Sequence, residues 1–517
     1  MARLIGGALL AALAACGGGG GGGDVGRGGV GGDPGGSGWI PGQFLPSDSF
    51  KGMCANPRAG TSDLQGTVLD ENNFLRSYSD ETYLWFDEIV DQDPSLFDSP
   101  LAYFDELKTT ERTSSGAEKD RFHFTIPTEE WEQLSQSGVS VGYGALWSLI
   151  ATSPPRKAVV AFVEPGSPAT DPGVDLARGA EVIAVDDELV ENGDPAILNA
   201  GLFPVEIGES HTFTILDQGA SGTREITMTS EDITSIPVHN VKTVQTNMGL
   251  VGYLLFNDHI ATAETHLIDA VEKLDALGIQ ELVVDIRYNG GGFLAIASEF
   301  AYMIAGAGPT DGQIFEEIRF SDKHPVTDPV TGEDLEPIPF YTQTRDFSEP
   351  PGKPLPTLNL PRVFVLTGPN TCSASESIIN SLRGIGVEVV QIGSTTCGKP
   401  YGFYATGNCG TTYFTIQFQG FNDKGFGEYG DGFSPQDGGN GVEIPGCPVA
   451  DDFSQALGNP AENRFEAALA YIENPGTCPA PTGVADSLSK VSAPLSATDG
   501  ITPKSPWREN RILRRRP

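Results

Sequence analysis

A serine and a lysine flank one predicted helix–strand unit at a spacing that would suit a nucleophile and its base. Residues 363–366 form an apolar run that predicts a buried strand, and Gly368, Pro369 and Asn370 break it. Ser373 then precedes a helical pattern that ends at Gly384. A second predicted strand, residues 387–392, leads into Thr-Cys-Gly-Lys, which ends at Lys399.

The start of a helix is a favourable place for a nucleophile. Its free backbone N–H groups and the helix dipole favour negative charge. If Ser373 and Lys399 meet, they form a Ser–Lys nucleophile and base. The alternative is structural: Ser373 and Glu376 match a capping box, and Lys399 would then be a solvated loop residue.

The same residues resemble a family of peptidases. Ser-Ala-Ser-Glu, a helix, a Val-rich strand and Thr-x-Gly-Lys are similar to the pattern of the carboxyl-terminal processing peptidases, also called tail-specific proteases. The resemblance spans about residues 60–475. It implies that Ser373 is the nucleophile and that Lys399 is the base. We expect no cofactor.

A glycine-rich turn supports this resemblance. Residues 285–292 read Asp-Ile-Arg-Tyr-Asn-Gly-Gly-Gly, which is similar to the family signature Asp-Leu-Arg-x-Asn-x-Gly-Gly. Three glycines after a strand can also simply turn the chain, and a phosphate cradle would need a GxGxxG or Gly-Lys-Ser/Thr pattern that is absent here. The resemblance implies an oxyanion hole made by the N–H groups of Gly291, with Gly292 as its neighbour, and of Ala374.

The match also has gaps. Several family members carry Gln four residues after the lysine, where this chain has Phe403. Some carry Asp in the turn after the nucleophile helix, where residues 383–386 read Arg-Gly-Ile-Gly. The six His are scattered and none lies in a triad motif, so no third catalytic residue is assigned.

The order of predicted elements indicates a multi-domain α/β protein. Strand and helix patterns alternate in residues 249–304 and 363–392, which predicts a layered α/β core, and the resemblance implies a ClpP/crotonase-like protease core. The predicted units are listed here: signal peptide, 1–15; Gly-rich tether, 16–55; helical domain, 56–136; PDZ-like β domain, 137–235; protease core, 236–478; disordered tail, 479–517.

The PDZ-like domain contains a candidate peptide-binding loop. Gly142, Tyr143, Gly144 and Ala145 lie where such a domain places its carboxylate-binding loop. Backbone N–H groups there would hold the C-terminal carboxylate of a peptide that adds a strand to the sheet. The loop departs from the usual Gly-Leu-Gly-Phe type, and a plain turn without a ligand is the alternative.

The composition excludes some classes of partner. A net charge of −37 argues against nucleic acid and against an anionic membrane surface as electrostatic partners. The acidic loop of residues 422–439 lacks EF-hand spacing, so we expect no metal site there. The expected partner is a protein or peptide substrate.

The first sixteen residues resemble a bacterial lipoprotein signal. Arg3 is followed by a short apolar run, and Leu-Ala-Ala-Cys ends at Cys16, the expected site of lipid attachment. A plain secretory signal is the alternative. We therefore expect a protein of the cell envelope, anchored by lipid, and Gly17 argues against retention in the inner membrane.

Six further cysteines remain, an even number that suits up to three disulfides in an exported protein. The sequence leaves their pairing open. A Cys397–Cys409 bridge would close a short loop beside Lys399, and a bridge from Cys372 would fix the loop of the nucleophile.

These observations predict a lipid-anchored serine endopeptidase that uses a Ser–Lys dyad. A binding protein that captures peptides without cutting them is the first alternative. An esterase is the second, but Ser373 lacks the required Gly-x-Ser-x-Gly elbow.

Overall fold

The computed structural model describes residues 39–151, 154–436, 441–478 and 511–512. The expected signal peptide, Cys16, the first part of the tether and most of the tail lie outside these residues. Within the described ranges, none of the helices combines the length and the hydropathy needed to cross a bilayer.

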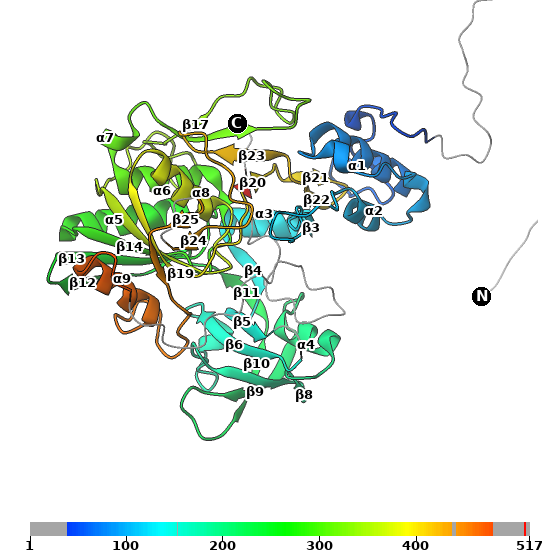
Figure 1. Ribbon diagram of the computed structural model, residues 1–517. Helices are drawn as coiled ribbons and strands as arrows, with labels where there is room; N and C mark the ends of the chain where they lie inside the picture. Colours follow the sequence, from blue (N-terminus) through cyan, green and yellow to red (C-terminus); the bar gives the residue numbers. More distant parts are fainter. Residues whose placement is uncertain (1–38, 152–153, 437–440, 479–510, 513–517) are drawn as a thin grey trace, which may run out of the picture.

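A six-stranded, mostly parallel sheet forms the centre of the protein (Figure 1). The first two strands pair antiparallel as a hairpin, and every later neighbour pairs in parallel. This sheet confirms the predicted α/β class. Its strands, in spatial order, are β12 Val238–Thr246, β13 Gly249–Phe256, β14 Glu281–Asp285, β18 Arg362–Thr367, β19 Glu388–Gly393 and β26 Gly446–Pro448.

Helices cover both faces of this sheet, because successive strand residues point to opposite sides. On β18, Val363 and Val365 belong to one apolar cluster, whereas Phe364 and Leu366 belong to another. The first cluster includes residues of α5 Ala263–Leu277, α6 Leu294–Ala305 and α8 Ala374–Gly384, and the second includes residues of α9 Asn463–Glu473.

The parallel strands bring the candidate site together. The carboxyl ends of β14, β18 and β19 meet at one edge of the sheet. The triglycine turn follows β14, Ser373 follows β18, and Lys399 follows β19.

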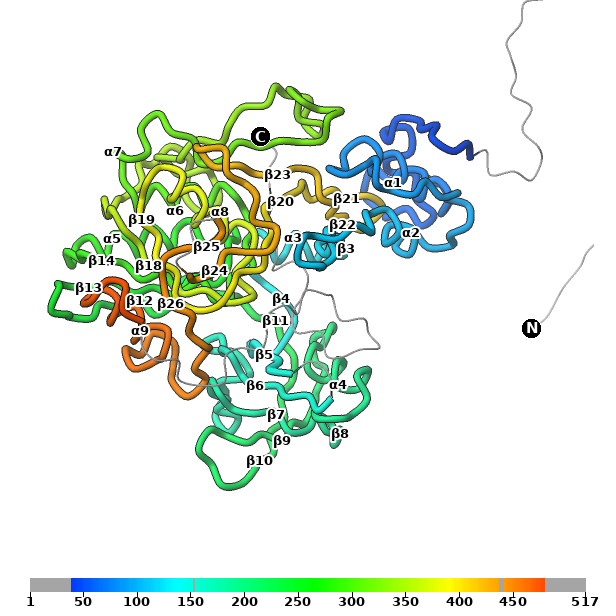
Figure 2. Tube along the Cα trace, in the orientation of Figure 1, coloured from blue at the N-terminus to red at the C-terminus, as the bar shows by residue number. Residues whose placement is uncertain are grey.

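A small β unit, residues 139–234, lies beside the core (Figure 2). Its main sheet has the order β10-β9-β7-β6-β5, with β8 paired to β7, so β5 is an edge strand. β4 and β11 pair with each other at its two ends. The elements are β4 Val139–Gly142, β5 Ala145–Ala151, β6 Lys157–Val163, β7 Glu181–Val185, β8 Glu188–Leu189, α4 Pro195–Leu202, β9 Ser210–Leu216, β10 Arg224–Thr229 and β11 Glu231–Thr234.

The N-terminal helices are joined to the core by a shared sheet. A capping box of Thr67 and Asp70 starts the longest of them, which packs its aromatic residues into a cluster of its own. β3 pairs with β22, Thr411–Phe414, of the core, so the two parts share backbone hydrogen bonds. The elements are β1 Met53–Cys54, β2 Leu64–Gln65, α1 Val68–Thr82, α2 Pro100–Glu106, β3 Phe124–Pro127 and α3 Thr128–Ser137.

Short strands surround the carboxyl edge of the central sheet. β17, β16, β23 and β20 form one small sheet, and β21 and β22 pair with each other. The remaining elements are α7 Ala307–Thr310, β15 Gly292–Phe293, β16 Ile314–Arg319, β17 Ile338–Pro339, β20 Tyr401–Gly402, β21 Thr406–Asn408, β22 Thr411–Phe414, β23 Phe418–Phe421, β24 Ser434–Pro435, β25 Glu443–Ile444 and β27 Arg511–Ile512.

Two tail residues differ from expectation. The sequence predicts disorder throughout residues 479–517, and this is wrong for Arg511–Ile512, which pair with β15. A strand of two residues is too short to show a periodic pattern in the sequence. It forms through its pairing with β15, which local residue preferences do not reveal.

One core carboxyl group makes stability depend on pH. Glu299 of α6 is buried, and its carboxyl oxygens have no hydrogen-bond partner among the described residues. Burial, and then the Glu264 carboxylate, raise the pKa of Glu299 to about 10. An unfolded glutamate titrates near pH ~4.3. The stability that protonated Glu299 contributes to the folded protein is therefore fully present below the unfolded pKa. It is lost as the pH rises through the folded pKa.

We expect Glu299→Gln to remove this dependence. For the wild type, Glu299 alone lowers the free energy of unfolding by about 1.4 kcal/mol per pH unit between pH ~5 and pH ~9, the interval between its unfolded and folded pKa values. Chemical denaturation at pH 7, 8 and 9 should show a difference between variant and wild type that grows with pH. The exposed residue of α5, Glu272, provides the control variant Glu272→Gln. Parallel pH curves for Glu299→Gln and the wild type would contradict the prediction.

Candidate active site

Ser373 lies in a strained turn at the start of α8. Its backbone has φ 61° and ψ −116°, a region that costs a residue with a side chain about 1–3 kcal/mol. The side chain is completely buried, and its Oγ has no hydrogen-bond partner among the described residues. The turn thus holds a serine hydroxyl away from water at the N-terminus of a helix.

Lys399 is also buried, against aromatic rings. Its Nζ lies 4.6 Å from the ring centre of Phe122 and 4.5 Å from that of Phe403. The preceding Gly398 has φ 82°, and a Cβ there would lie 2.4 Å from the carbonyl oxygen of Gly430. Only glycine fits this approach, so the backbone leading to Lys399 is tightly constrained.

The carboxylate of Glu376 connects the two loops. Its Oε2 accepts hydrogen bonds from the backbone N–H of Ser373 (2.9 Å) and of Lys399 (2.8 Å). The two backbone nitrogens are therefore no farther apart than the sum of these distances. The other oxygen of Glu376, Oε1, accepts hydrogen bonds from the backbone N–H of Gly398 (2.8 Å) and from the Thr396 hydroxyl (2.5 Å).

Glu376 therefore does more than cap its helix, the role that its position in the sequence predicts. Complete burial raises the pKa of its carboxyl group, and the hydrogen bonds that it accepts oppose this rise. All four of these partners donate, so the group acts as a carboxylate in this geometry.

A disulfide reinforces the same connection. Cys372 and Cys397 are bonded, with a Cα–Cα distance of 5.1 Å, and this fixes the loop of the nucleophile as one of the sequence alternatives expected. The other alternative, a Cys397–Cys409 bridge, is wrong, because Cys409 is bonded to Cys54. Cys447 is bonded to Cys478. The sequence could not choose among them, because each pair depends on contacts between distant segments.

The triglycine turn packs directly against the nucleophile loop. The carbonyl oxygen of Asn289 accepts from Cys372 N–H and from the Ser375 hydroxyl, each at 3.1 Å. Gly291 and Gly292 have φ 101° and 136°, which favour glycine. The turn, Ser373 and Lys399 are thus brought together as the sequence predicts.

The N–H groups of Gly291 and Ala374, the two expected oxyanion donors, differ in their hydrogen-bond partners. The N–H of Gly291 donates to Asn289 Oδ1 at 2.9 Å, inside its own turn. Ala374 is the first residue of α8, where a backbone N–H has no acceptor within the helix. Gly291 would therefore have to leave its side-chain partner before it could hold an oxyanion.

His259 is a site residue that the sequence did not reveal. Its Nδ1 lies 3.0 Å from Asn289 Oδ1, and its backbone N–H donates to the carbonyl oxygen of Gly291. Burial lowers the pKa of His259 to about 3, so the imidazole is neutral. The nearest signal in the sequence is its place just after the strand at 249–256, which by itself does not suggest a role.

A buried cluster of charged residues holds Arg287, which lies just before the triglycine turn. Arg287 donates to Asp285 (2.9 Å), to Asp451 (2.7 Å) and to Glu462 (2.8 Å). Arg178 of the small β unit also donates to Asp451 and to the hydroxyl of Tyr288. The arginines hold the pKa of Asp451 far below its usual range, so this network stays charged.

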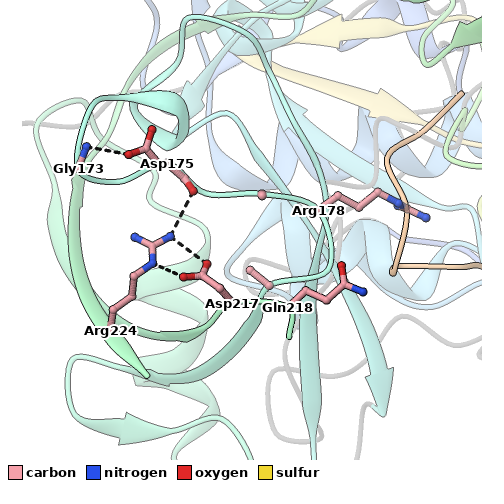
Figure 3. A pocket seen from close by; sticks show the side chains of 8 residues that line it. Gly173, Asp175, Arg178, Asp217, Gln218 and Arg224 are labelled. Carbon is pink, nitrogen blue, oxygen red and sulfur yellow. Dashed lines mark hydrogen bonds and ion pairs between the residues drawn. The ribbon is translucent and has the colours of Figure 1, made fainter. Parts of the chain in front are cut away.

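Two other places do not form comparable sites. Among the described residues, Cys372, Glu376 and Cys397 have metal-ligand spacing, but the two sulfurs are joined to each other. A pocket in the small β unit is lined by residues of 173–180 together with Asp217, Gln218 and Arg224. There Arg224 already pairs with Asp217 (Figure 3).

The loop of Gly142, Tyr143, Gly144 and Ala145 lies at the start of edge strand β5. The Tyr143 side chain is buried and donates to the carbonyl oxygen of Gly201 in α4. The loop is thus held beside α4, and peptide binding there remains a prediction.

We expect Glu376→Gln to lower kcat by about 10²-fold, because the amide cannot accept all four hydrogen bonds and the two loops would shift. KM should change little, since Glu376 lies beneath the loops. Steady-state peptide hydrolysis measures both constants, and Glu388→Gln, an exposed change on β19, is the control. An unchanged kcat would remove Glu376 as a positioning residue.

Comparisons with known proteins find similarity in the part of the chain that contains the candidate site. Residues 250–402 match the model of "Peptidase family S41", a range that includes the triglycine turn, Ser373 and Lys399. A carboxyl-terminal-processing protease from Picosynechococcus sp. is 28% identical over 140 residues, 26% of this chain and 32% of the relative. The match thus spans about a third of that relative.

Structural similarity extends further. The crystal structure of a candidate S41 protease from Bacteroides fragilis NCTC 9343 has a TM-score of 0.57 and 23% identity, over 77% of this chain and 97% of that chain. At this identity the likeness establishes the fold. Together with the family match it confirms the resemblance inferred from residues 285–292 and 373–399. Residues 250–402 of this chain are thus similar to peptidase family S41, and the fold around them is that of a solved S41 protease structure.

Proposed function

We propose that this chain is a serine endopeptidase in which Ser373 attacks a peptide carbonyl and Lys399 accepts its proton. One observation carries the proposal: a single carboxylate oxygen of Glu376 accepts the backbone N–H groups of both residues. The disulfide between Cys372 and Cys397 supports the same pairing. The strained backbone at Ser373 is typical of functional sites.

The surroundings of Lys399 suit a base. A lysine can accept a proton only as a neutral amine, and removal from water favours that form. The Lys399 side chain is completely buried between two aromatic rings. As the Ser373 oxygen bonds to the carbonyl carbon, its proton passes to Lys399 Nζ.

The remaining steps follow from the same groups. The amides of Ala374 and, once released from Asn289, of Gly291 would stabilise the oxyanion, a contribution of about 3–4 kcal/mol per donor. The ammonium of Lys399 then protonates the leaving amine, and the peptide's acyl part stays on Ser373. Water, deprotonated by Lys399, hydrolyses this ester and restores the hydroxyl.

The test is hydrolysis of an unstructured polypeptide by the full chain. Mass spectrometry of the products should show internal peptide bonds cut, with one water added for each cut. A protein that only binds peptides would leave the polypeptide intact, and this result would contradict the proposal.

We infer further that the small β unit binds a substrate by its C-terminus. β5 is an edge strand among the described residues, and the Gly142–Ala145 loop lies at its start. The Trp147 Nε1–H donates to Leu202, which keeps α4 beside β5. An extended peptide could add to this edge by backbone pairing.

We propose a location in the bacterial cell envelope, with a lipid on Cys16 and substrates among exported proteins. The support is the sequence of residues 3–16 and the presence of three disulfides, which suit an oxidising compartment. Gly17 favours the outer membrane.

A further inference from the structure

A short strand near the end of the sequence lies beside the turn that follows β14. β27, Arg511–Ile512, pairs in parallel with β15, so that Gly292 faces Arg511 and Phe293 faces Ile512. β15 follows Gly291 of the triglycine turn directly. β27 therefore pairs with the residues that directly follow the turn proposed to hold the oxyanion.

The same segment also contacts the strand that follows the lysine. β20, Tyr401–Gly402, begins two residues after Lys399 and contacts β27 (Figure 1, where β27 is the short red strand). Within the described ranges, β27 is the strand that pairs with β15. The segment thus lies between the strand after the oxyanion turn and the strand after the base.

This is a position that an extended substrate could take. A peptide binds a strand edge through backbone hydrogen bonds, which any sequence can make, and neighbouring surfaces then select its side chains. An edge next to the oxyanion turn would place a bound peptide close to Ser373. A segment already paired to that edge prevents another peptide from pairing there.

The sequence at this end of the chain is basic, in contrast to the chain as a whole. The chain has a net charge of −37, yet residues 511–516 contain four of its 32 Lys and Arg residues. A basic segment is attracted to an acidic protein. Because it is tethered, it competes with an effective concentration on the order of 1 mM.

We propose that Arg511–Ile512 is an internal competitor that occupies the substrate strand position beside β15 and must leave before a peptide can bind there. This inference rests on the proposed peptidase function, because it assigns the occupant of that same site. It also predicts the kind of external ligand: an extended, basic peptide that pairs in parallel with Gly292–Phe293.

The experiment compares full-length variants. Arg511→Pro/Ile512→Pro removes both backbone N–H groups and so prevents strand pairing. Arg511→Ala/Ile512→Ala keeps these N–H groups and changes the same side chains, which makes it the matched control. All forms also carry Ser373→Ala, so that a bound peptide is not cut.

The probe is a fluorescent synthetic peptide with the sequence of residues 508–515, blocked at both ends, and its binding is measured by anisotropy. We expect the proline form to bind it about tenfold more tightly than the alanine form or the parent, because the competitor has been removed. A scrambled peptide of the same composition should show no such difference. Equal affinity of all three forms for the probe would overturn the inference.

A second arm separates this inference from the proposed function. With Ser373 intact, kcat/KM for an unstructured peptide should rise about tenfold in the proline form only. Hydrolysis at the same rate in all forms would overturn the inference and leave the peptidase function standing. Tighter probe binding without hydrolysis by any form would support the inference and contradict the function.

Discussion

Ser373→Ala is expected to reduce peptide hydrolysis by about 10⁴-fold or more, since removal of the nucleophile from such a catalytic unit leaves only residual rate enhancement. The substitution deletes one oxygen that has no hydrogen-bond partner among the described residues. Stability should therefore change little, and peptide binding should persist. The measurement is kcat and peptide affinity for the same substrate.

The chain offers a close control for this change. Ser381 lies in the same helix, is equally buried, and its hydroxyl also has no partner in the described part of the chain. Ser381→Ala should keep wild-type activity. Substantial hydrolysis by Ser373→Ala would contradict the assignment of the nucleophile.

Lys399→Met is expected to cause a loss of similar size, because the nucleophile and its base act as one unit. Methionine keeps an unbranched apolar stem between Phe122 and Phe403 but has no amine. The protein should remain folded, as circular dichroism and thermal unfolding can verify. Steady-state hydrolysis then measures the loss.

Lys399→Arg separates a base from a simple positive charge. A guanidinium carries a permanent positive charge and does not lose its proton in proteins, so this variant should also be inactive. Retained activity in Lys399→Arg would show that the site needs a charge there and would exclude Lys399 as the base.

Local patterns predicted the central sheet and the location of the site closely. The alternating strand and helix patterns expected in residues 249–304 correspond to β13, α5, β14 and α6, and α5 is followed by Gly278 with φ 70°. Because β14, β18 and β19 are parallel, the loops that follow them meet at one edge of the central sheet. This explains why two short motifs sufficed to place the turn, Ser373 and Lys399 together.

The rest of the site depends on contacts between distant residues. The role of Glu376 needs a loop 22 or 23 residues away to fold back onto its carboxylate. His259 and Asn289 are 30 residues apart, and Phe122 reaches Lys399 from the N-terminal part of the chain. Such hydrogen bonds and ring contacts leave no periodic trace in the sequence, and neither does the pairing of β27.

The most direct test is covalent labelling of the nucleophile. The wild type is treated with a fluorophosphonate, which phosphonylates an activated serine hydroxyl, and the modified residue is located by peptide mass spectrometry. We predict one adduct, on Ser373, that is absent from Ser373→Ala and forms far more slowly in Lys399→Met. An adduct on another residue, or equal labelling of wild type and Lys399→Met, would contradict the account of Ser373 as a nucleophile activated by Lys399.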